Sequence, residues 1–367
     1  MAKQGLLPPI CDRVADWAIR HSAAEVTALF SPRTITRILP RTVESQIDDV
    51  YLSRRIANQG GRYLVPLDRA RLVGPTGLIR LSDGSFSAES VYRRSNVLAD
   101  PDYRVRTRRP QRACPGNYFS LLVVWARGRA YYHWLHDTLE RLYGVMEHLP
   151  DDTKFIVPAE LAPFQRETLR LVGIDEDRIA PYSGEEWELE RLYFAPPATN
   201  SGSHRRDADA WLRDAILDAY GISSGSPDRR IFVSRRSQNE RRVVNETALE
   251  EFLSGYGFET CVPEHLSFRQ QVELFAEADV IVSTHGSAFT NMLFAPRGVK
   301  VVDMIEPGMI PWGYVFWAMA EELGHEYWYF VADAVSRPGH QNDTLVPIDK
   351  LASTFDSMGL GPSHICL

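Results

Sequence analysis

The pattern of apolar and polar positions is most regular in the last third of the chain, where apolar runs alternate with helical patterns. Short runs with few polar residues are typical of strands buried on both faces of a parallel sheet. Four such strands are expected, at 230–234, 258–262, 279–283 and 300–305. Helices are expected between them, beginning near Asn245, Ser267 and Ser287. This order predicts a Rossmann-like half domain.

The earlier part of the chain shows two other patterns. Residues 61–102 alternate apolar and polar positions between turn residues, which predicts short antiparallel strands. Between 118 and 194, strand-like runs alternate with helical patterns at 132–149 and 163–171, which predicts βαβ units and a mostly parallel sheet. We therefore expect an α/β protein with four segments: a β-rich extension at 1–110, α/β domains at 111–225 and 226–345, and a tail at 346–367.

Composition narrows the class of protein. The chain has 367 residues, of which 44% are hydrophobic and 24% charged, as in ordinary globular proteins of about two domains. Its formal net charge of −7 argues against a nucleic acid as partner. Four cysteines lie far apart, so we expect neither a disulfide framework nor a zinc site, and a reducing cytoplasm fits. No signal peptide or membrane span is expected, so we predict a soluble or peripheral protein.

Polar residues follow the four predicted C-terminal strands. In an open parallel sheet the ligand crevice lies beyond the carboxyl ends of the strands. The residues at these ends are Ser234, Arg235, Glu264, His285, Gly286, Ser287 and Asp303. A glycine before a helix lets the backbone approach an anion at the helix N-terminus, and arginine forks grip phosphate oxygens.

Each of these residues also has an ordinary structural interpretation. A turn histidine explains His285 about as well as an anion site does. Arg235, with Arg241 or Arg242, could bind a diphosphate or lie exposed to solvent. Asp303 could bond a ribose hydroxyl or serve as a strand-end turn residue.

A second group of polar residues lies in the predicted helix at 132–149. His133 and Asp137 are four residues apart, so they share a helix face, and a histidine next to a carboxylate suits a general base. His136 and Glu140 repeat this spacing, so position alone does not choose the pair. For both pairs the alternative is a structural role in helix capping, or polar side chains that simply face solvent. No third ligand accompanies His133 and His136 at a recognised spacing, and the three Asp-x-Asp strings are expected in loops, so no metal is expected.

Four motifs together carry a resemblance to a known family. They are Tyr132-His-Trp-Leu-His-Asp-Thr-Leu-Glu-Arg-Leu, Ser234-Arg235 followed by Arg242, Asn245 and Glu246, Pro263-Glu264-His-Leu-Ser-Phe-Arg-Gln-Gln-Val, and His285-Gly-Ser-Ala-Phe-Thr-Asn291. With them the chain resembles glycosyltransferase family 61, which includes plant xylosyl- and arabinosyltransferases, animal N-acetylglucosaminyltransferases and bacterial capsular polysaccharide proteins. The resemblance covers residues 118–306.

The resemblance implies a fold and a set of site residues. It implies a GT-B fold, with two Rossmann-like domains facing across a cleft, the acceptor on the domain at 111–225 and the nucleotide-sugar on the domain at 226–345. It further implies an inverting, metal-independent reaction without a cofactor. The implied donor-site residues are Ser234, Arg235, Arg242, Asn245, Glu264, His285, Gly286, Ser287, Asn291 and Asp303, and the implied acceptor-side catalytic residues are His133 and Asp137. Ser287-Ala288-Phe289 departs from the usual Ala-Gly-Leu, and Asp303 from the usual glutamate.

The expected function is therefore transfer of a sugar from a nucleotide-sugar to a hydroxyl of a glycan or glycoconjugate, in bacterial surface polysaccharide synthesis. The expected nucleotide is uridine diphosphate. The lack of a membrane anchor favours a cytoplasmic enzyme. Such an enzyme could also lie at the surface of the inner membrane or belong to a polysaccharide assembly complex. Two alternatives remain: a nucleotide-sugar epimerase or hydrolase of the same architecture, and a non-catalytic nucleotide- or glycan-binding protein.

Overall fold

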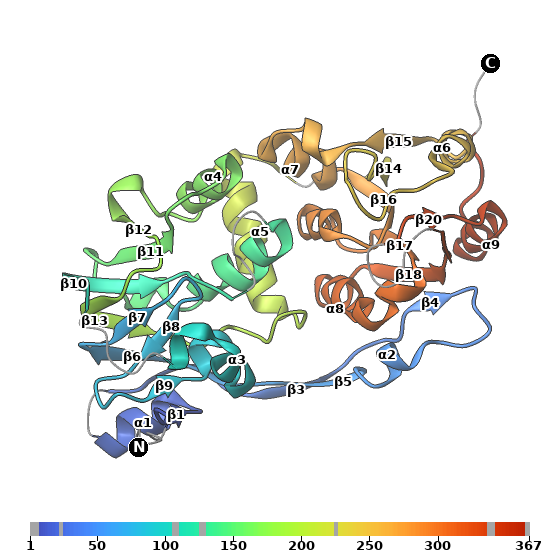
Figure 1. Cartoon of the computed structure of the whole chain (residues 1–367). Helices are drawn as coiled ribbons and strands as arrows, with labels where there is room; N and C mark the ends of the chain where they lie inside the picture. The colour runs from blue at the N-terminus through green and yellow to red at the C-terminus, as the bar shows by residue number, and fades with distance from the viewer. Residues whose placement is uncertain are drawn as a thin grey trace. The chain divides into compact units, whose positions relative to one another are not determined.

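The chain forms two compact units in a computed structural model that describes residues 7–21, 25–104, 110–124, 130–223, 227–335 and 342–363 (Figure 1). The N-terminal unit consists of residues 1–33 and 59–201, and the C-terminal unit of residues 34–58 and 202–367. Both units combine helices with parallel strands, which confirms the expected α/β class.

A ten-stranded mixed sheet forms the centre of the N-terminal unit. Its strands are β1 (Ile10–Cys11), β2 (Thr27–Phe30), β6 (Arg62–Asp68), β7 (Arg71–Val73), β8 (Leu78–Arg80), β9 (Phe86–Ser87), β10 (Arg112–Ser120), β11 (Lys154–Pro158), β12 (Ile179–Tyr182) and β13 (Trp187–Phe194). They follow the order β1-β9-β8-β7-β13-β10-β11-β12, and β6 pairs with β13 and β2. The strands β13, β10, β11 and β12 are parallel, as the pattern at 118–194 predicts.

Short helices surround this sheet. They are α1 (Val14–His21), η1 (Glu89–Val91), α3 (Arg94–Ala99), η2 (Pro101–Arg104), η3 (His133–Thr138), η4 (Leu139–Leu142), η5 (Met146–His148), α4 (Pro163–Leu171) and η6 (Glu176–Arg178). Pro163 occupies the first position of α4, where a missing backbone N–H costs no helical hydrogen bond. Buried side chains of α1 and of the sheet, such as Trp17, Ile156 and Leu189, form the core.

A six-stranded parallel sheet forms the centre of the C-terminal unit. Its strands are β14 (Arg229–Val233), β15 (Phe258–Cys261), β16 (Ala278–Thr284), β17 (Lys300–Ile305), β18 (Glu326–Val331) and β4 (Arg41–Thr42), in the order β15-β14-β16-β17-β18-β4. The four predicted strands are confirmed as β14, β15, β16 and β17. Two small sheets pair β3 (Arg33–Thr36) with β5 (Ile56–Gln59), and β19 (Asp333–Ala334) with β20 (Thr344–Leu345).

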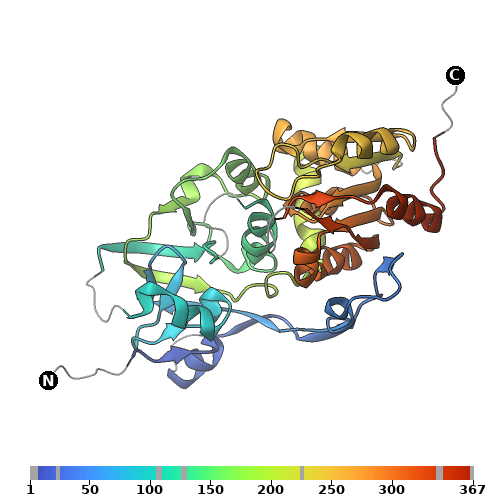
Figure 2. The ribbon, with the colours of Figure 1, turned by 45° about the vertical axis from the view of Figure 1, so that its right-hand side comes forward.

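Helices cover both faces of the C-terminal sheet (Figures 1 and 2). They are α2 (Asp49–Leu52), α5 (Arg206–Tyr220), α6 (Glu246–Ser254), η7 (Pro263–His265), α7 (Phe268–Ala276), η8 (Ser287–Phe294), η9 (Pro307–Trp312), α8 (Tyr314–Leu323) and α9 (Ile348–Met358). The capping box of α7 is confirmed, because Ser267 Oγ accepts a bond from Gln270 N at 3.2 Å and Gln270 Oε1 accepts one from Ser267 N at 2.8 Å.

The two units divide the chain differently from the four expected segments. Residues 61–102 are not a separate extension, because β6 and β7 pair antiparallel with β13 in the same sheet. The helix α5 precedes the expected boundary at 222–228 but belongs to the C-terminal unit, where Arg206 bonds Glu322 of α8 through its backbone N at 3.1 Å. The expected tail at 346–367 contains α9, whose Leu351 and Phe355 are buried in the C-terminal core.

The helix expected at 132–149 is irregular. A π-helical segment, η3, is followed by the 3-10 segments η4 and η5. Of the apolar residues at helical spacing in this segment, Leu135, Leu139 and Leu142 are fully buried, whereas Met146 is partly exposed. The spacing of apolar residues does not reveal this change in helical hydrogen bonding, because the buried residues remain on one side of the helix.

Two further expectations concern membranes and cysteines. None of the helices in the described parts of the chain is long and apolar enough to cross a membrane. Cys11, Cys114 and Cys261 are buried free thiols, whereas Cys366 lies outside the described residues.

Candidate functional site

The carboxyl edge of the C-terminal sheet brings together residues from three neighbouring strands. β14, β16 and β17 are adjacent and parallel, so the residues that follow them meet at one edge. Arg235 follows β14, His285 and Gly286 follow β16, and Glu306 follows β17. These residues form the candidate donor site.

Arg235 is a buried cation in this site. Its exposed fraction is 8%, and its Nε and Nη2 donate to the carbonyls of Arg241 at 3.1 Å and Glu240 at 3.4 Å. Burial and the nearby charge of Arg241 lower the pKa of Arg235 to about 10, so the side chain stays protonated at neutral pH. Among the residues that the structure describes, no carboxylate lies within ion-pair distance of it. The guanidinium therefore keeps its capacity to pair with an anion.

Gly286 has a steric role beside this arginine. Its φ of 177° is extended, so no unusual backbone conformation requires a glycine here. A Cβ at this position would lie 2.1 Å from Nη1 of Arg235, whose side chain is held by its bonds to carbonyls. Gly286 therefore lets the guanidinium lie directly against the start of η8.

The second arginine at this edge is Arg241. Its Nη1 donates to the carbonyl of His285 at 3.2 Å, and burial lowers its pKa. Its φ of 58° is left-handed, a strained conformation for a side chain of this size. Arg242, by contrast, is exposed and pairs with Asp343 at 3.2 Å. The sequence left open whether Arg241 or Arg242 accompanies Arg235, and in the structure it is Arg241 that lies at the edge.

His285 is held in one orientation by a buried carboxylate. Its Nδ1 lies 2.6 Å from Oδ2 of Asp303, and Tyr327 donates to the same oxygen at 2.7 Å. Burial and the neighbouring Asp303 raise the pKa of Tyr327 well above its ordinary value, so the hydroxyl stays protonated and donates. Because a carboxylate only accepts hydrogen bonds, His285 donates from Nδ1 and turns Nε2 away from Asp303.

Asp303 does not reach the surface where a ribose would bind. Its exposed fraction is 0%, because it lies inside β17, and the strand ends at Ile305. The acidic residue that directly follows the strand is Glu306, which sequence reasoning missed. Glu306 Oε1 accepts bonds from Gly308 N at 2.9 Å and from Asn342 Nδ2 at 2.8 Å. The signal was available, since Glu306 is the first charged residue after the apolar run.

The N-terminal unit contains the other candidate pair. His133 Nδ1 lies 2.6 Å from Oδ2 of Asp137, and Ser201 Oγ donates to that oxygen at 2.8 Å. Both residues of the pair lie in η3, and π-helical segments are frequent at functional sites. The carboxylate is thus held from two sides and keeps Nε2 of His133 directed away from it.

Exposure distinguishes this pair from the second pair of the same spacing. His136 Nδ1 lies 2.5 Å from Oε1 of Glu140, and the side chains of this pair are only 3% and 2% exposed. The side chain of His133 is 33% exposed. Only the pair of His133 and Asp137 therefore presents an imidazole to ligands from solvent.

Comparison with known proteins shows a similarity to one family over part of the chain. Residues 131–302 match the family model described as glycosyltransferase 61. Over these residues, somewhat less than half of the chain, the sequence is similar to the glycosyltransferase 61 family. A beta-1,2-xylosyltransferase of Oryza sativa subsp. japonica is 23% identical over 219 residues, which cover 53% of this chain and 37% of that protein. The match therefore spans little more than a third of the relative's length.

Several residues implied by the family resemblance hold the site together. Ser234 Oγ donates to Glu246 and accepts from Arg236 N at 3.1 Å, which orders the loop after β14. Asn245 precedes α6 but does not cap it, because its amide pairs with both backbone groups of Val346, at 2.8 and 3.0 Å.

The remaining implied residues differ in accessibility. Asn291 is fully buried and donates to Gln271 of α7 at 2.9 Å. Glu264 is exposed and accepts a bond from Gln238. Ser287 is the partly exposed first residue of η8. Of the residues that meet at this edge, Arg241 and Ser287 are partly exposed, whereas Arg235, His285 and Gly286 are buried.

None of the three Asp-x-Asp strings lies wholly in a loop, because Asp102 lies in η2, Asp177 in η6 and the third string in α5. Asp207 and Asp209 occupy the first turn of α5, and Asp209 lies 3.3 Å from Nδ1 of His204. This arrangement serves the start of the helix, where carboxylates are favoured by the helix dipole.

Proposed function

We propose that the chain is a glycosyltransferase that moves a sugar from a nucleotide-sugar, uridine-linked, to a hydroxyl of a glycan or glycoconjugate. The observation that carries this proposal is the buried guanidinium of Arg235, which lies against Gly286 at the carboxyl edge of the sheet. A fixed cation at this edge suits the diphosphate that leaves during transfer. The match of residues 131–302 to the glycosyltransferase 61 model supports the same reaction class.

The donor half of the mechanism is charge stabilisation. As the bond from the anomeric carbon to the β-phosphate oxygen breaks, negative charge builds on the diphosphate. Arg235, Arg241 and the N-terminal amides of η8 at Ser287 are fixed beforehand to meet that charge. His285, held through Nδ1, would direct Nε2 toward the same oxygens.

The acceptor half is proton removal. Nε2 of His133 accepts the proton of the acceptor hydroxyl while the oxygen attacks the anomeric carbon from the face opposite the diphosphate, which inverts the configuration. Asp137 holds the ring and stabilises its charged form, and Ser201 fixes Asp137. If Asp137 is itself the base, His133 is its partner in the same pair.

The wider setting is also part of the proposal. We assign the acceptor to the N-terminal unit and the donor to the C-terminal unit, in a GT-B arrangement, with the two arginines and the helix end taking the part that a metal plays in other transferases. Bacterial surface polysaccharide synthesis, in the cytoplasm or at the inner membrane surface, is the setting that the family resemblance suggests.

Transfer assays test the proposal. The purified chain is incubated with a panel of uridine-linked sugars and glycan acceptors, with and without EDTA, and the anomeric configuration of the product is read by NMR. We expect inverted product that survives EDTA. Arg235→Ala should abolish turnover with the fold intact, and Arg242→Ala serves as the matched control. Donor consumption without acceptor would indicate an epimerase or hydrolase, and donor binding without turnover a binding protein.

A further inference from the structure

The two ring nitrogens of His285 have different surroundings. Nδ1 lies 2.6 Å from Oδ2 of Asp303. Nε2 has no hydrogen-bond partner among the described residues, yet the protein does not enclose it, in contrast to the buried Nδ1 of His325. Nε2 can therefore exchange a proton at the sheet edge while Nδ1 stays bonded to Asp303.

Asp303 is a buried carboxylate whose close surroundings offer little positive charge. It is 0% exposed, Tyr327 donates to its Oδ2 at 2.7 Å, and its Oδ1 is buried without a hydrogen-bond partner in the described parts of the chain. No described arginine or lysine lies within ion-pair distance of it, whereas His285 does. Because a buried charge is costly unless it is paired, Asp303 favours a proton on His285.

Two arginines act in the opposite direction. Arg241 donates to the backbone carbonyl of His285 at 3.2 Å. The guanidinium of Arg235 lies against Gly286, the next residue. Their positive charges oppose a positive imidazole, and Arg241 also partly offsets the charge of Asp303 from farther away.

The other groups around the ring carry no charge at neutral pH. Burial raises the pKa of Tyr327 and of Tyr51 well above the ordinary value, so both hydroxyls stay protonated. Phe316 of α8 packs on the ring of His285, with 4.8 Å between the ring centres. The charge of His285 therefore depends on one carboxylate, two guanidiniums and the ligand that binds at the edge.

A bound diphosphate changes this balance. Its ionised oxygens only accept hydrogen bonds, and a neutral imidazole that donates from Nδ1 only accepts at Nε2. The two therefore repel each other unless Nε2 carries a proton. The negative charge of the ligand also offsets the repulsion from Arg235 and Arg241. Because imidazoles change charge near neutral pH, a ligand can shift this equilibrium.

We propose that a diphosphate binds at the carboxyl edge together with a proton, which Nε2 of His285 holds and donates as a hydrogen bond to a phosphate oxygen. The proton comes from solvent, forms the N–H bond at Nε2 and returns to solvent when the ligand dissociates. The inference rests on the proposed function and adds a pH dependence to it. His285 becomes the third cation of the donor site, and only while the ligand is bound.

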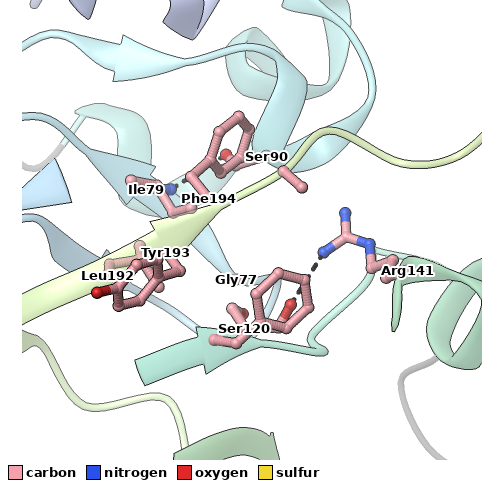
Figure 3. Close-up of a pocket in the computed structure, with 10 residues that line it drawn as sticks. Gly77, Ile79, Ser90, Ser120, Arg141, Leu192, Tyr193 and Phe194 are labelled. Carbon is pink, nitrogen blue, oxygen red and sulfur yellow. Dashed lines mark hydrogen bonds between the residues drawn. The ribbon is translucent and has the colours of Figure 1, made fainter. Parts of the chain in front are cut away.

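A buried arginine of the N-terminal unit, Arg141, does not compete for the ligand. Its Nη1 donates to the carbonyls of Ser120 at 3.4 Å and Leu122 at 3.0 Å, and its Nε and Nη2 are enclosed by the protein. Figure 3 shows this side chain with its bond to Ser120. The space beside it is about 10 Å³, which holds at most one water molecule, so a diphosphate does not fit there.

Calorimetric titration measures the proton directly. Uridine diphosphate is added to the full chain at pH 8 with EDTA, in three buffers whose ionisation enthalpies differ. The slope of the binding enthalpy against the ionisation enthalpy gives the number of protons taken up. Uridine diphosphate glucose is the second probe, because its diphosphate does not titrate near neutral pH. We expect uptake of roughly 0.5–1 proton with either probe, and a loss of affinity of about three- to tenfold between pH 7.5 and pH 8.5.

Two histidine variants identify the group that takes up the proton. His285→Gln keeps a hydrogen-bonding side chain beside Asp303 but does not titrate, so uptake should fall below roughly 0.2 proton and the pH dependence should be lost. His133→Gln is the matched control, because Nδ1 of His133 also lies 2.6 Å from a carboxylate, that of Asp137. This variant should keep the uptake of the parent chain. Unfolding midpoints show whether both variants fold.

The outcomes separate this inference from the proposed function. Binding of both probes by the parent chain without proton uptake would overturn the inference and leave the donor site in place. Uptake that persists in folded His285→Gln, or that is lost equally in His133→Gln, would overturn it as well. Absence of binding by the parent chain would overturn the donor site and the inference together. The measurement on the parent chain needs no variant, so it decides even if His285→Gln does not fold.

Discussion

The sequence predicts which polar residues stand near the ends of the strands, but not whether each side chain faces a ligand or the protein interior. The positions of Arg235, His285 and Gly286 after their strands follow from the apolar runs alone. Asp303 was also expected at the surface, yet it lies within β17 and is fully buried. The strand predicted at 300–305 already extends two residues past Asp303, so the pattern itself places this aspartate within the strand and not at its end. Only the fold reveals that Asp303 acts on His285 rather than on a ligand.

A double-mutant cycle tests this positioning role. Asp303→Asn should weaken the binding of uridine diphosphate roughly tenfold, because the ring of His285 loses the acceptor that fixes Nδ1. In a His285→Ala background the same substitution should have almost no effect. Calorimetric titration of all four proteins measures the coupling. Equal losses in both backgrounds would mean that Asp303 acts independently of His285.

A second residue-scale prediction concerns pH. Burial lowers the pKa of His325 from 6.5 to about 4, and Nε2 donates to the carbonyl of Met292 at 3.0 Å. Between these two values the unfolded chain binds a proton that the folded chain does not, so stability falls as pH falls through this window. The loss amounts to about 2–3 kcal/mol. Urea unfolding at pH 7 and pH 4.5 measures it.

The matched control for this effect is His325→Gln, which retains a donor for the Met292 carbonyl but does not titrate. Its stability should change less than that of the parent chain between the same two pH values. If both proteins lose the same stability on acidification, His325 is not the source.

At the scale of elements, the strand-to-helix junction of β16 and η8 is defined by packing. The sequence identifies Gly286 as a residue that permits close approach. The partner that approaches is Arg235, which follows β14, and this contact exists only because β14 and β16 are neighbours. The irregular helix η3 is a second case, since the choice of His133 over His136 depends on burial that helical spacing does not encode.

Gly286→Ala is the prediction at this scale. The added methyl group would collide with Nη1 of Arg235 and displace the guanidinium, so binding of uridine diphosphate should weaken by roughly tenfold or more. Gly298→Ala is not a suitable control because its φ of 88° is left-handed. Ser287→Ala, one residue away, changes no contact with Arg235 and should retain most of the affinity. Equal losses in the two variants would contradict the steric account.

At the scale of the whole molecule, the sequence did not reveal which segments belong together. Residues 34–58 belong to the C-terminal unit, where the two-residue strand β4 pairs with β18. A strand so short has no periodic signal. Its attachment depends on Tyr51, which is fully buried and whose ring lies 5.5 Å from that of Trp317 and 4.7 Å from that of Tyr329. Contacts so distant along the chain leave no local trace in composition or spacing.

Tyr51→Ala tests this assignment. Loss of a fully buried aromatic side chain should cost the C-terminal unit about 3–5 kcal/mol. Hydrogen exchange read by mass spectrometry should show faster exchange in β17 and β18 and unchanged exchange in β10 and β13. Loss of protection in the N-terminal sheet alone would show that the segment is assigned to the wrong unit.

In the proposed function, the carboxyl edge of the C-terminal sheet binds a diphosphate through Arg235. Calorimetric titration with uridine diphosphate in the presence of EDTA measures this directly, in the parent chain and in the matched variants Arg235→Gln and Arg242→Gln. We expect the parent chain to bind uridine diphosphate, Arg235→Gln to lose about a hundredfold in affinity because this arginine is buried at the edge, and Arg242→Gln to change affinity only a few fold because this arginine is exposed. Absence of binding by the parent chain, or equal losses in the two variants, would contradict it.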